Sequence, residues 1–333
     1  MKKHTLRLHI LVTLLIFAIS ISLAACFEVG NAPDSSEPTD TPTESPSESK
    51  SDIPATPTAP EKTDPEPTGT EPEETAPEEQ KPEPTGTEPE ETAPEEQKPE
   101  PFTLNIGSFN IANGANVHHN MKYFGDDIKN LGLDIVGLQE VDQFVPRSKK
   151  QDTVKLISEY SGLPYYAFFK AIDLNGGEYG VAILSRYPIV DTFYLKLYSG
   201  TNEQRVIGGA KIDVNGTIIN FFSTHLSFES KSLRNRQFSQ VASLVEGLDN
   251  FIITGDFNTS DFSEYAPIKN AGMVNNSKHS IYTFPSTGPS SSIDNIVYST
   301  GNWTFENPEI VLNEHSDHCM LYAVGTFTPS TEE

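Results

Sequence analysis

Five short polar signatures in the C-terminal two-thirds of the chain combine residue types suited to metal and phosphate chemistry. Four of the five follow or end an apolar, β-branched run, where a strand would deliver its last side chains to the rim of a sheet. Cleavage of a phosphoester needs a cation, an activated water and hydrogen-bond donors for the developing charge. The signatures supply candidates for each, and they are Ser108–Ile111, Leu138–Val141, Thr224–Leu226, Gly255–Asn258 and Ser316–His318.

Carboxylate and amide groups in these signatures indicate a site for a hard cation. Glu140 comes at the end of an expected strand that starts at Asp134, and Asn110 lies within the first signature. Oxygen ligands of this kind suit Mg²⁺ or Mn²⁺. Asp256 and Asn258 leave the apolar run 251–254 two residues apart, so both would face one side of an extended chain.

Two histidines could donate a proton or a hydrogen bond near neutral pH, and each has a candidate carboxylate partner. These candidates are Asp294 for His318 and Glu178 for His225. A carboxylate beside an imidazole fixes its tautomer and favours its charged form.

Two arginines and a tyrosine could contact the substrate phosphate. Arg205 opens an expected strand over 206–214, Arg147 follows the Glu140 strand, and Tyr179 lies beside Glu178. A guanidinium can bind phosphate through two parallel hydrogen bonds. Exposed arginines are common, so a solvent-facing Arg147 is an equal alternative, and Tyr179 could merely pack.

In this order and spacing, the signatures resemble the endonuclease/exonuclease/phosphatase superfamily of metal-dependent phosphoesterases, from Phe102 to about Phe327. The resemblance implies a four-layer α/β sandwich of two packed mixed sheets flanked by helices. It also implies that Glu140, Asn110 and Asp317 serve the metal and that Asp256 and Asn258 handle a metal-positioned water. Both histidines would support the phosphoryl charge and the leaving oxygen, with His318 oriented by Asp294 and His225 by Glu178.

The sequence itself supports an α/β or α+β domain. Helical periodicity is expected over 116–131, 153–161 and 232–248. Between 165 and 226, strands alternate with the turn sequences Asn175–Gly177 and Asn215–Gly216, which predicts an antiparallel meander. Cys319, before the run 320–324, is expected to be a small buried hydrophobe.

The first 101 residues predict an export signal and a tether. Basic residues precede an apolar stretch over 8–23 that ends in Leu23–Cys26, and this pattern resembles a lipoprotein signal in which Cys26 is lipidated after cleavage. An ordinary secretory signal or an uncleaved anchor is the alternative. Residues 27–101 are rich in Pro, Glu and Thr, repeat the segment 65–81 at 82–98, and are expected to be a disordered spacer. We therefore expect a cell-membrane lipoprotein whose catalytic domain, 102–329, faces the extracytoplasmic side.

Most of the net charge of −24 belongs to the tether, which has 4 Lys or Arg against 22 Asp or Glu, or −18. Residues 102–333 contain 16 Lys or Arg and 25 Asp or Glu, a net charge of −9. This negative charge counts against indiscriminate nucleic-acid binding. Ala112 stands where the abasic-endonuclease branch carries an acidic residue, which argues against that branch.

Three functions therefore remain open for a chain that we expect to be monomeric. The first is hydrolysis of a phosphodiester such as nucleic acid or a phospholipid headgroup, and the second is hydrolysis of a phosphomonoester. The third is a retired hydrolase that serves as a surface binding module.

Overall fold

The computed structural model describes residues 100–330, and the segments expected to form the export signal, Cys26 and most of the tether lie outside them. Within the described range, no helix is both long and apolar enough to cross a membrane. The first strand begins at Phe102 and the last one ends at Phe327.

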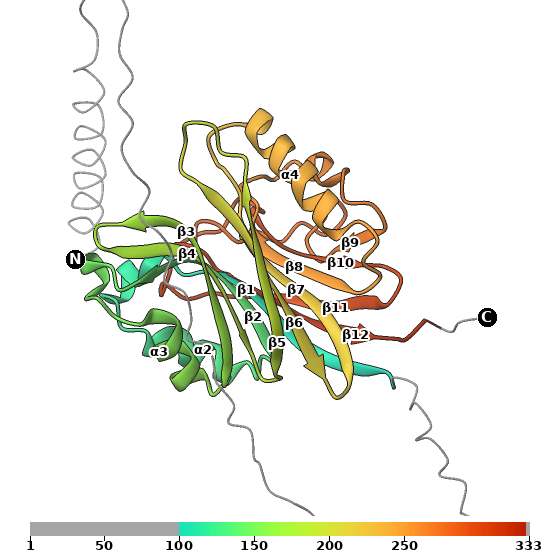
Figure 1. Cartoon of the computed structure of the whole chain (residues 1–333), viewed down its shortest axis with the longest axis horizontal. Coiled ribbons are helices and arrows are strands. Elements are labelled where there is room, and N and C mark those ends of the chain that lie inside the picture. Colours follow the sequence, from blue (N-terminus) through green and yellow to red (C-terminus); the bar gives the residue numbers. More distant parts are fainter. Residues whose placement is uncertain (1–99, 331–333) are drawn as a thin grey trace, which may run out of the picture. The chain divides into compact units, whose positions relative to one another are not determined.

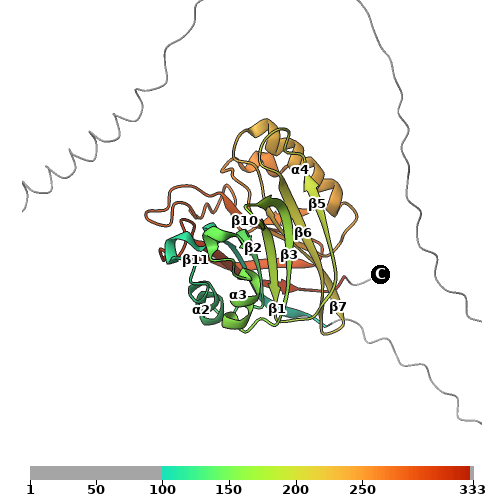
Figure 2. The same ribbon diagram turned by 60° about the vertical axis from the view of Figure 1, so that its left-hand side comes forward.

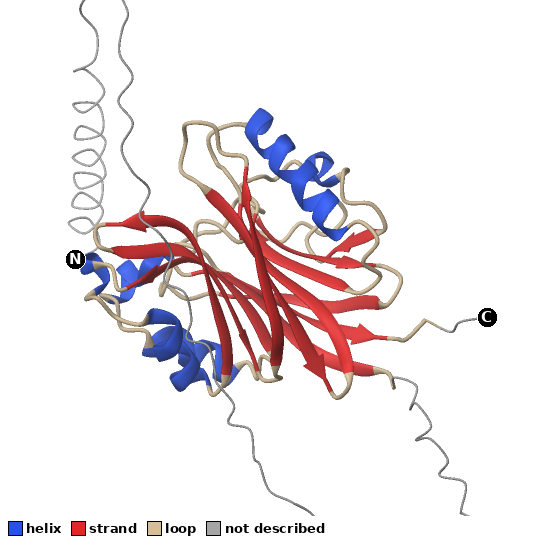
Figure 3. Cartoon of the chain, viewed as in Figure 1, coloured by secondary structure: helices blue, strands red, loops and turns tan. Residues whose placement is uncertain are grey.

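Two six-stranded mixed sheets pack against each other and are covered by helices on their outer faces (Figure 1; Figure 3). The first sheet has the strand order β11 (Trp303–Val311), β12 (Met320–Phe327), β1 (Phe102–Asn110), β2 (Ile135–Gln143), β4 (Gly177–Ser185) and β3 (Tyr165–Leu174). The second sheet has the order β5 (Ile189–Leu197), β6 (Arg205–Val214), β7 (Thr217–His225), β8 (Phe251–Asp256), β10 (Asp294–Ser299) and β9 (Ala271–Met273). This architecture confirms the predicted four-layer sandwich.

Each sheet has one parallel pair at its centre, β1 with β2 and β7 with β8, and its other pairs are antiparallel. The two parallel pairs contact each other across the sandwich. Carboxyl ends of parallel strands lie at the same edge of a sheet. The fold therefore brings the ends of four strands, and the polar residues placed there, to one rim of the molecule.

The space between the sheets is filled by apolar side chains that alternate along the strands. Gly137 of β2 allows an especially close approach, because a Cβ atom there would lie 1.9 Å from Oγ1 of Thr254. Next to this contact, Gln139 donates from Nε2 to Oγ of Ser223 at 3.1 Å, which joins β2 to β7. These contacts hold the two sheets in register just below the rim.

The helices lie on opposite outer faces, with α2 (Lys122–Asn130) and α3 (Thr153–Ser161) on the first sheet and α4 (Lys231–Val245) on the second (Figure 2). Oγ of Ser230 accepts from the backbone N–H of Leu233 at 3.2 Å and caps α4. At α3, Asp152 caps the first turn and Gly162, with φ of 77°, ends the helix. Both boundaries follow from local sequence.

The predicted helix over 116–131 is wrong in its first half. Residues Ala112–Val117 form a short 3₁₀ helix (η1), and α2 begins only at Lys122. His118 and His119, with φ of 50° and 57°, adopt left-handed backbone and interrupt the helix. The separate helix α3 and the turns that contain Asn175 and Asn215 are as predicted, and the strands of the meander are divided between the two sheets.

Two shorter 3₁₀ helices, η2 (Pro146–Ser148) and η3 (Phe262–Tyr265), lie in loops near the rim. Cys319 is buried, with 1% of its surface exposed, as predicted for a small hydrophobe that precedes β12.

Candidate active site

Asn110 lies at the centre of the polar cluster at the rim. At the end of β1, its Nδ2 atom is 3.1 Å from Oε1 of Glu140, 3.0 Å from Oδ2 of Asp256 and 3.4 Å from Nε2 of His318. Its Oδ1 accepts from the backbone N–H of Ala112 at 3.0 Å, which fixes the amide. One buried side chain thus links residues from β2, β8 and the loop before β12.

A bulge in β2 presents Glu140 to the cluster. The register between β2 and β4 shifts between Leu138 and Val141, and Glu140 has a φ of 55°. A β-bulge re-aims a side chain, and left-handed backbone at a residue other than glycine costs about 1–3 kcal/mol. The remaining structure maintains this conformation at the residue predicted to bind the metal.

Asp256 and Asn258 lie close together as predicted, but β8 ends at Asp256 and Asn258 does not continue its extended geometry. The backbone N–H of Asn258 donates to Oδ1 of Asp256 at 2.9 Å, and the φ of Asn258 is 52°. Because the other carboxylate oxygen, Oδ2, accepts from Asn110, Asp256 is held from two sides. Only 2% of the Asp256 surface is exposed.

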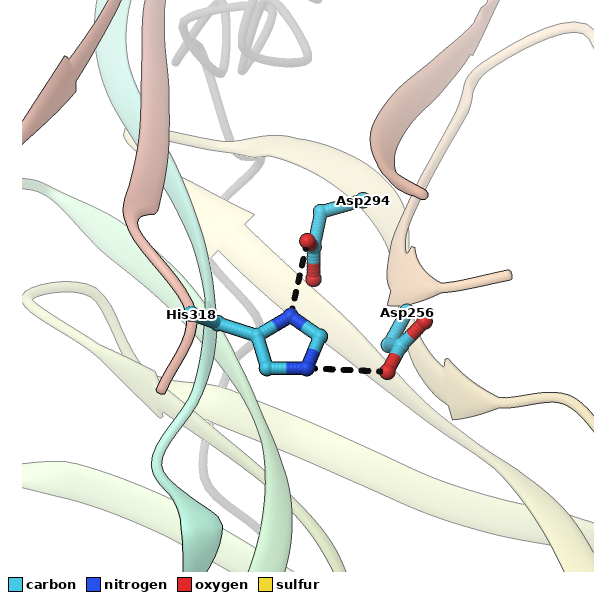
Figure 4. A group of neighbouring side chains, drawn as sticks. All are labelled: Asp256, Asp294 and His318. Carbon is cyan, nitrogen blue, oxygen red and sulfur yellow. Dashed lines mark hydrogen bonds and ion pairs between the residues drawn. The ribbon is translucent and has the colours of Figure 1, made fainter. Parts of the chain in front are cut away.

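His318 lies between two buried carboxylates (Figure 4). Its Nδ1 is 2.9 Å from Oδ2 of Asp294, and its Nε2 is 3.6 Å from Oδ2 of Asp256. Asp294 opens β10 and pairs directly with Asp256 in the sheet, which explains why both acids reach one imidazole. The structure brings His318 and Asp294 together as the family resemblance implied.

These contacts keep His318 positively charged. Burial opposes the charge, but Asp294 and then Asp256 outweigh burial and raise the pKa of His318 to about 10. Burial raises the pKa of Asp256, and the His318 imidazolium offsets only part of that effect. At neutral pH the site therefore contains an imidazolium beside a carboxyl group whose pKa is raised.

Replacing Asp294 with Asn is expected to lower the pKa of His318 from about 10 toward the ordinary 6.5, because the largest stabilisation of the imidazolium is removed. The pair stabilises the fold fully below about pH 6.5 and loses this contribution as the pH rises through the folded-state value. The wild type should therefore lose its stability advantage over the Asp294→Asn variant as the pH approaches 10. Histidine titration by NMR and unfolding by urea at several pH values check this. An unchanged His318 titration would contradict the pairing.

His225, at the end of β7, has partners different from the one predicted. Its Nδ1 lies 3.1 Å from Nη1 of Arg205, and its Nε2 lies 3.0 Å from Nδ2 of Asn258. Burial, followed by Arg205 and His318, holds the pKa of His225 well below its usual range. The predicted pairing of His225 with Glu178 is wrong.

Glu178 lies outside the site. Its carboxylate is paired with Lys170 at 3.0 Å, and 40% of its side chain is exposed. The reason is the pleat of β4, because adjacent residues of a strand point to opposite faces. Tyr179, the next residue, faces the cleft, and Glu178 faces away from it.

The predicted phosphate-binding residues line a cleft of about 510 Å³. Arg205, with 4% of its surface exposed, is buried at the cleft wall, and its Nε is a buried donor that has no partner among the described residues. Arg147 reaches the same cleft from the loop after β2, but it forms two hydrogen bonds of 2.8 Å with Asp142 and lies over the ring of Tyr179. Arg205 thus has a free hydrogen-bond donor, and much of Arg147 is already engaged.

Several cleft residues were not predicted from the sequence. Glu203 pairs with Arg205 at 2.9 Å, Phe228 is an exposed aromatic residue three positions after His225, and Phe284 packs on His318. Proximity to Arg205 and His225 in the chain was an available signal for Glu203 and Phe228. Phe284 lies 34 positions before His318, and no local pattern indicates this contact.

Two groups of side chains could hold a cation. Asp256, Asp294 and His318 offer atoms that all lie within 4.8 Å of one another. However, the imidazolium form of His318 carries a proton on both ring nitrogens, so it has no lone pair for a metal, and it already offsets one of the two negative charges. This arrangement fits a proton-donating pair better than a metal centre.

The second group is Glu140 with Asn110 and Asp317, and it fits a metal ion better. Burial raises the pKa of Glu140, and repulsion by Asp317 raises it further, although Asn110 donates a hydrogen bond. Glu140 and Asp317 line the same cleft. A divalent cation bound there would relieve the repulsion between these two carboxylates.

A match to a family model shows to which proteins this chain is related. Residues 102–318 match the model of the endonuclease/exonuclease/phosphatase family. The chain belongs to this family. Its members are metal-dependent enzymes that hydrolyse phosphoester bonds, and the chain is accordingly a hydrolase of this class. Glu140 and Asp317 in the cleft are residues able to bind the metal.

Solved structures share the fold at low sequence identity. A family protein from Beutenbergia cavernae DSM 12333 is 16% identical, with a TM-score of 0.56, and the match covers 68% of this chain and 72% of that one. The catalytic domain of human Nocturnin is 19% identical, with a TM-score of 0.53 and coverage of 68% and 95%. A mannosyl-6-phosphatase of Bacteroides thetaiotaomicron is 18% identical, with a TM-score of 0.50 and coverage of 66% and 98%. The curated proteins give no match.

Proposed function

We propose that this protein is a Mg²⁺-dependent phosphodiester hydrolase, anchored through Cys26 to the extracytoplasmic side of the cell membrane. The observation that carries the catalytic part is the position of Asn110, whose amide contacts Glu140, Asp256 and His318. A carboxylate for the cation, a base and an imidazolium thereby share one cleft.

Glu140, Asn110 and Asp317 would hold the ion. When bound, Mg²⁺ supplies positive charge that polarises the phosphoryl group. Mn²⁺ would fit the same oxygen ligands.

Asp256 acts as the base in this mechanism. Its Oδ1 is held by the backbone of Asn258, and the carboxylate can accept a proton as water attacks phosphorus. Burial raises the pKa of Asp256 and so increases its basicity relative to an exposed aspartate.

His318 stabilises charge on the phosphoryl oxygens. In an in-line displacement, the attacking and leaving oxygens lie on opposite sides of phosphorus. The Nε2 of His318 is 3.6 Å from the proposed base, so it cannot also reach an oxygen that leaves on the far side. It is suited to donate to a non-bridging oxygen, and Arg205, whose Nε has no partner among the described residues, lies at the wall of the same cleft.

The lining of the cleft favours a substrate with groups on both sides of phosphorus. Ile172, Leu174 and Tyr179 come from the first sheet, and Phe228 and Ile293 come from loops of the second sheet. An ester with two substituents could contact both walls. This supports a diester over a monoester.

Hydrolysis of three substrates by the full-length protein tests the proposal. We expect metal-dependent cleavage of bis-p-nitrophenyl phosphate that exceeds cleavage of p-nitrophenyl phosphate, with plasmid DNA as a nuclease substrate, and we expect EDTA to stop it. Faster cleavage of the monoester would make the protein a phosphomonoesterase. No turnover, together with no Mg²⁺ or Mn²⁺ binding by calorimetry, would support a binding module.

Labelling with a radioactive fatty acid tests the anchor separately. The wild type should incorporate label, and the Cys26→Ala variant should not. Equal labelling of both proteins would refute lipidation at Cys26.

A further inference from the structure

The guanidinium of Arg205 faces the imidazole of His225 inside the cleft. Nη1 of Arg205 lies 3.1 Å from Nδ1 of His225 and 2.9 Å from Oε1 of Glu203. A guanidinium has hydrogen-bond donors and no acceptor. Nδ1 of His225 must therefore offer its lone pair, and the proton of a neutral imidazole must lie on Nε2.

The surroundings of Nε2 identify where that proton points. The nearest side-chain atoms are Nδ2 of Asn258 at 3.0 Å and Oδ2 of Asp256 at 3.4 Å. Nδ2 of Asn258 already donates to the carbonyl of Leu226 at 2.9 Å, so the amide nitrogen, which cannot accept, faces the ring. Oδ2 of Asp256 is the acceptor nearest to Nε2, and it lies at ion-pair distance and not in hydrogen-bond geometry.

We propose that Arg205 is a positioning residue that fixes His225 as the neutral tautomer with its proton on Nε2, so that His225 holds Asp256 and does not transfer a proton to substrate. The tautomer is independent of the reaction. Its consequence for catalysis rests on the proposed function.

The two histidines of the site then have opposite roles that follow from the charge of their partners. His318 is paired with the carboxylate of Asp294, and His225 is paired with the cation of Arg205. Asp256 lies between them, 3.4 Å from His225 and 3.6 Å from His318. Groups placed in such different environments take different protonation states at one pH.

Electrostatics supports this geometry. The charged groups that face His225 are Arg205, with Glu203 behind it, and Asp256 and His318 on the other side. Burial is the largest cause of the lowered pKa of His225, and the positive charges of Arg205 and His318 add to it.

Nitrogen NMR of the ¹⁵N-labelled full-length protein, without substrate, tests the inference. We expect the wild-type His225 to show an unprotonated Nδ1 and a protonated Nε2 from about pH 5.5 to 8, a range that spans the ordinary histidine pKa. In the Arg205→Met variant, which removes the donors, the pKa of His225 should rise, and the preference for one tautomer should weaken. Arg205→Lys, which retains a cationic donor, should preserve the wild-type tautomer.

Arg186→Met is the matched control, because Arg186 pairs with Asp134 at 2.8 Å and does not line the cleft. It should leave the His225 signals unchanged. A protonated Nδ1 in the wild type, or an Arg205→Met variant with an unchanged His225 titration, would overturn the proposal. The wild-type spectrum alone tests the predicted tautomer, even if the variants fail to fold. Because the measurement involves no turnover, its result is separate from the outcome of the substrate assays.

Discussion

The Glu140→Gln variant is expected to lose about a thousandfold or more in kcat/KM, equivalent to about 4 kcal/mol of transition-state stabilisation. Gln keeps the size of the side chain and can still hydrogen-bond with Asn110. It removes the negative charge that, together with Asp317, would bind the cation. Burial already raises the pKa of Glu140, so a neutral side chain at this position should not destabilise the fold.

Steady-state kinetics and Mg²⁺ calorimetry check this expectation, with circular dichroism to confirm folding. Glu159→Gln is the matched control, because Glu159 is exposed on α3 and its nearest cation is Lys155 at 3.9 Å. That variant should behave as the wild type does. Retention of both activity and metal affinity by Glu140→Gln would remove Glu140 from the metal site.

The His318→Gln variant is expected to lose about a hundredfold to a thousandfold in kcat, the range typical of a positioned group that stabilises developing charge. Gln can donate a hydrogen bond but cannot carry the positive charge that His318 holds between Asp294 and Asp256. Two buried carboxylates would lose their shared cation, so a lower free energy of unfolding should accompany the loss of activity.

Kinetics at several pH values and urea unfolding separate the two effects. His279→Gln is the control, because His279 is exposed and does not line the cleft. If kcat falls less than about tenfold in His318→Gln, the imidazolium is not the group that stabilises the phosphoryl charge.

Local sequence determined which side chains could reach the rim. Asn110, His225 and Asp256 each end a strand in the structure, as their position after apolar runs predicted. The pairing of His318 with Asp294 was also expected, although it rested on the resemblance to a family and the spacing alone could not reveal it.

Contacts between distant residues were harder to predict. Arg205 and His225 lie on the antiparallel strands β6 and β7, and their side chains meet only because of the register of these strands. Glu178 was the wrong partner because its place in the pleat of β4 turns it toward Lys170. The prediction of a helix over 116–131 was wrong because His118 and His119 adopt left-handed backbone, which the pattern of apolar residues does not indicate.

The sequence by itself determined the fold class, the strands that end in polar residues, and the types of chemical group available, because hydrophobic periodicity and strand ends are local properties. Only the tertiary structure decided which side chains of the site contact one another. The bulge that turns Glu140 into the site, the close contact of Gly137 with Thr254, and the cation beside His225 all depend on how two sheets pack and register. The packing and register of the sheets therefore determine the charge of each histidine, since a pKa depends on the groups that surround a side chain in space.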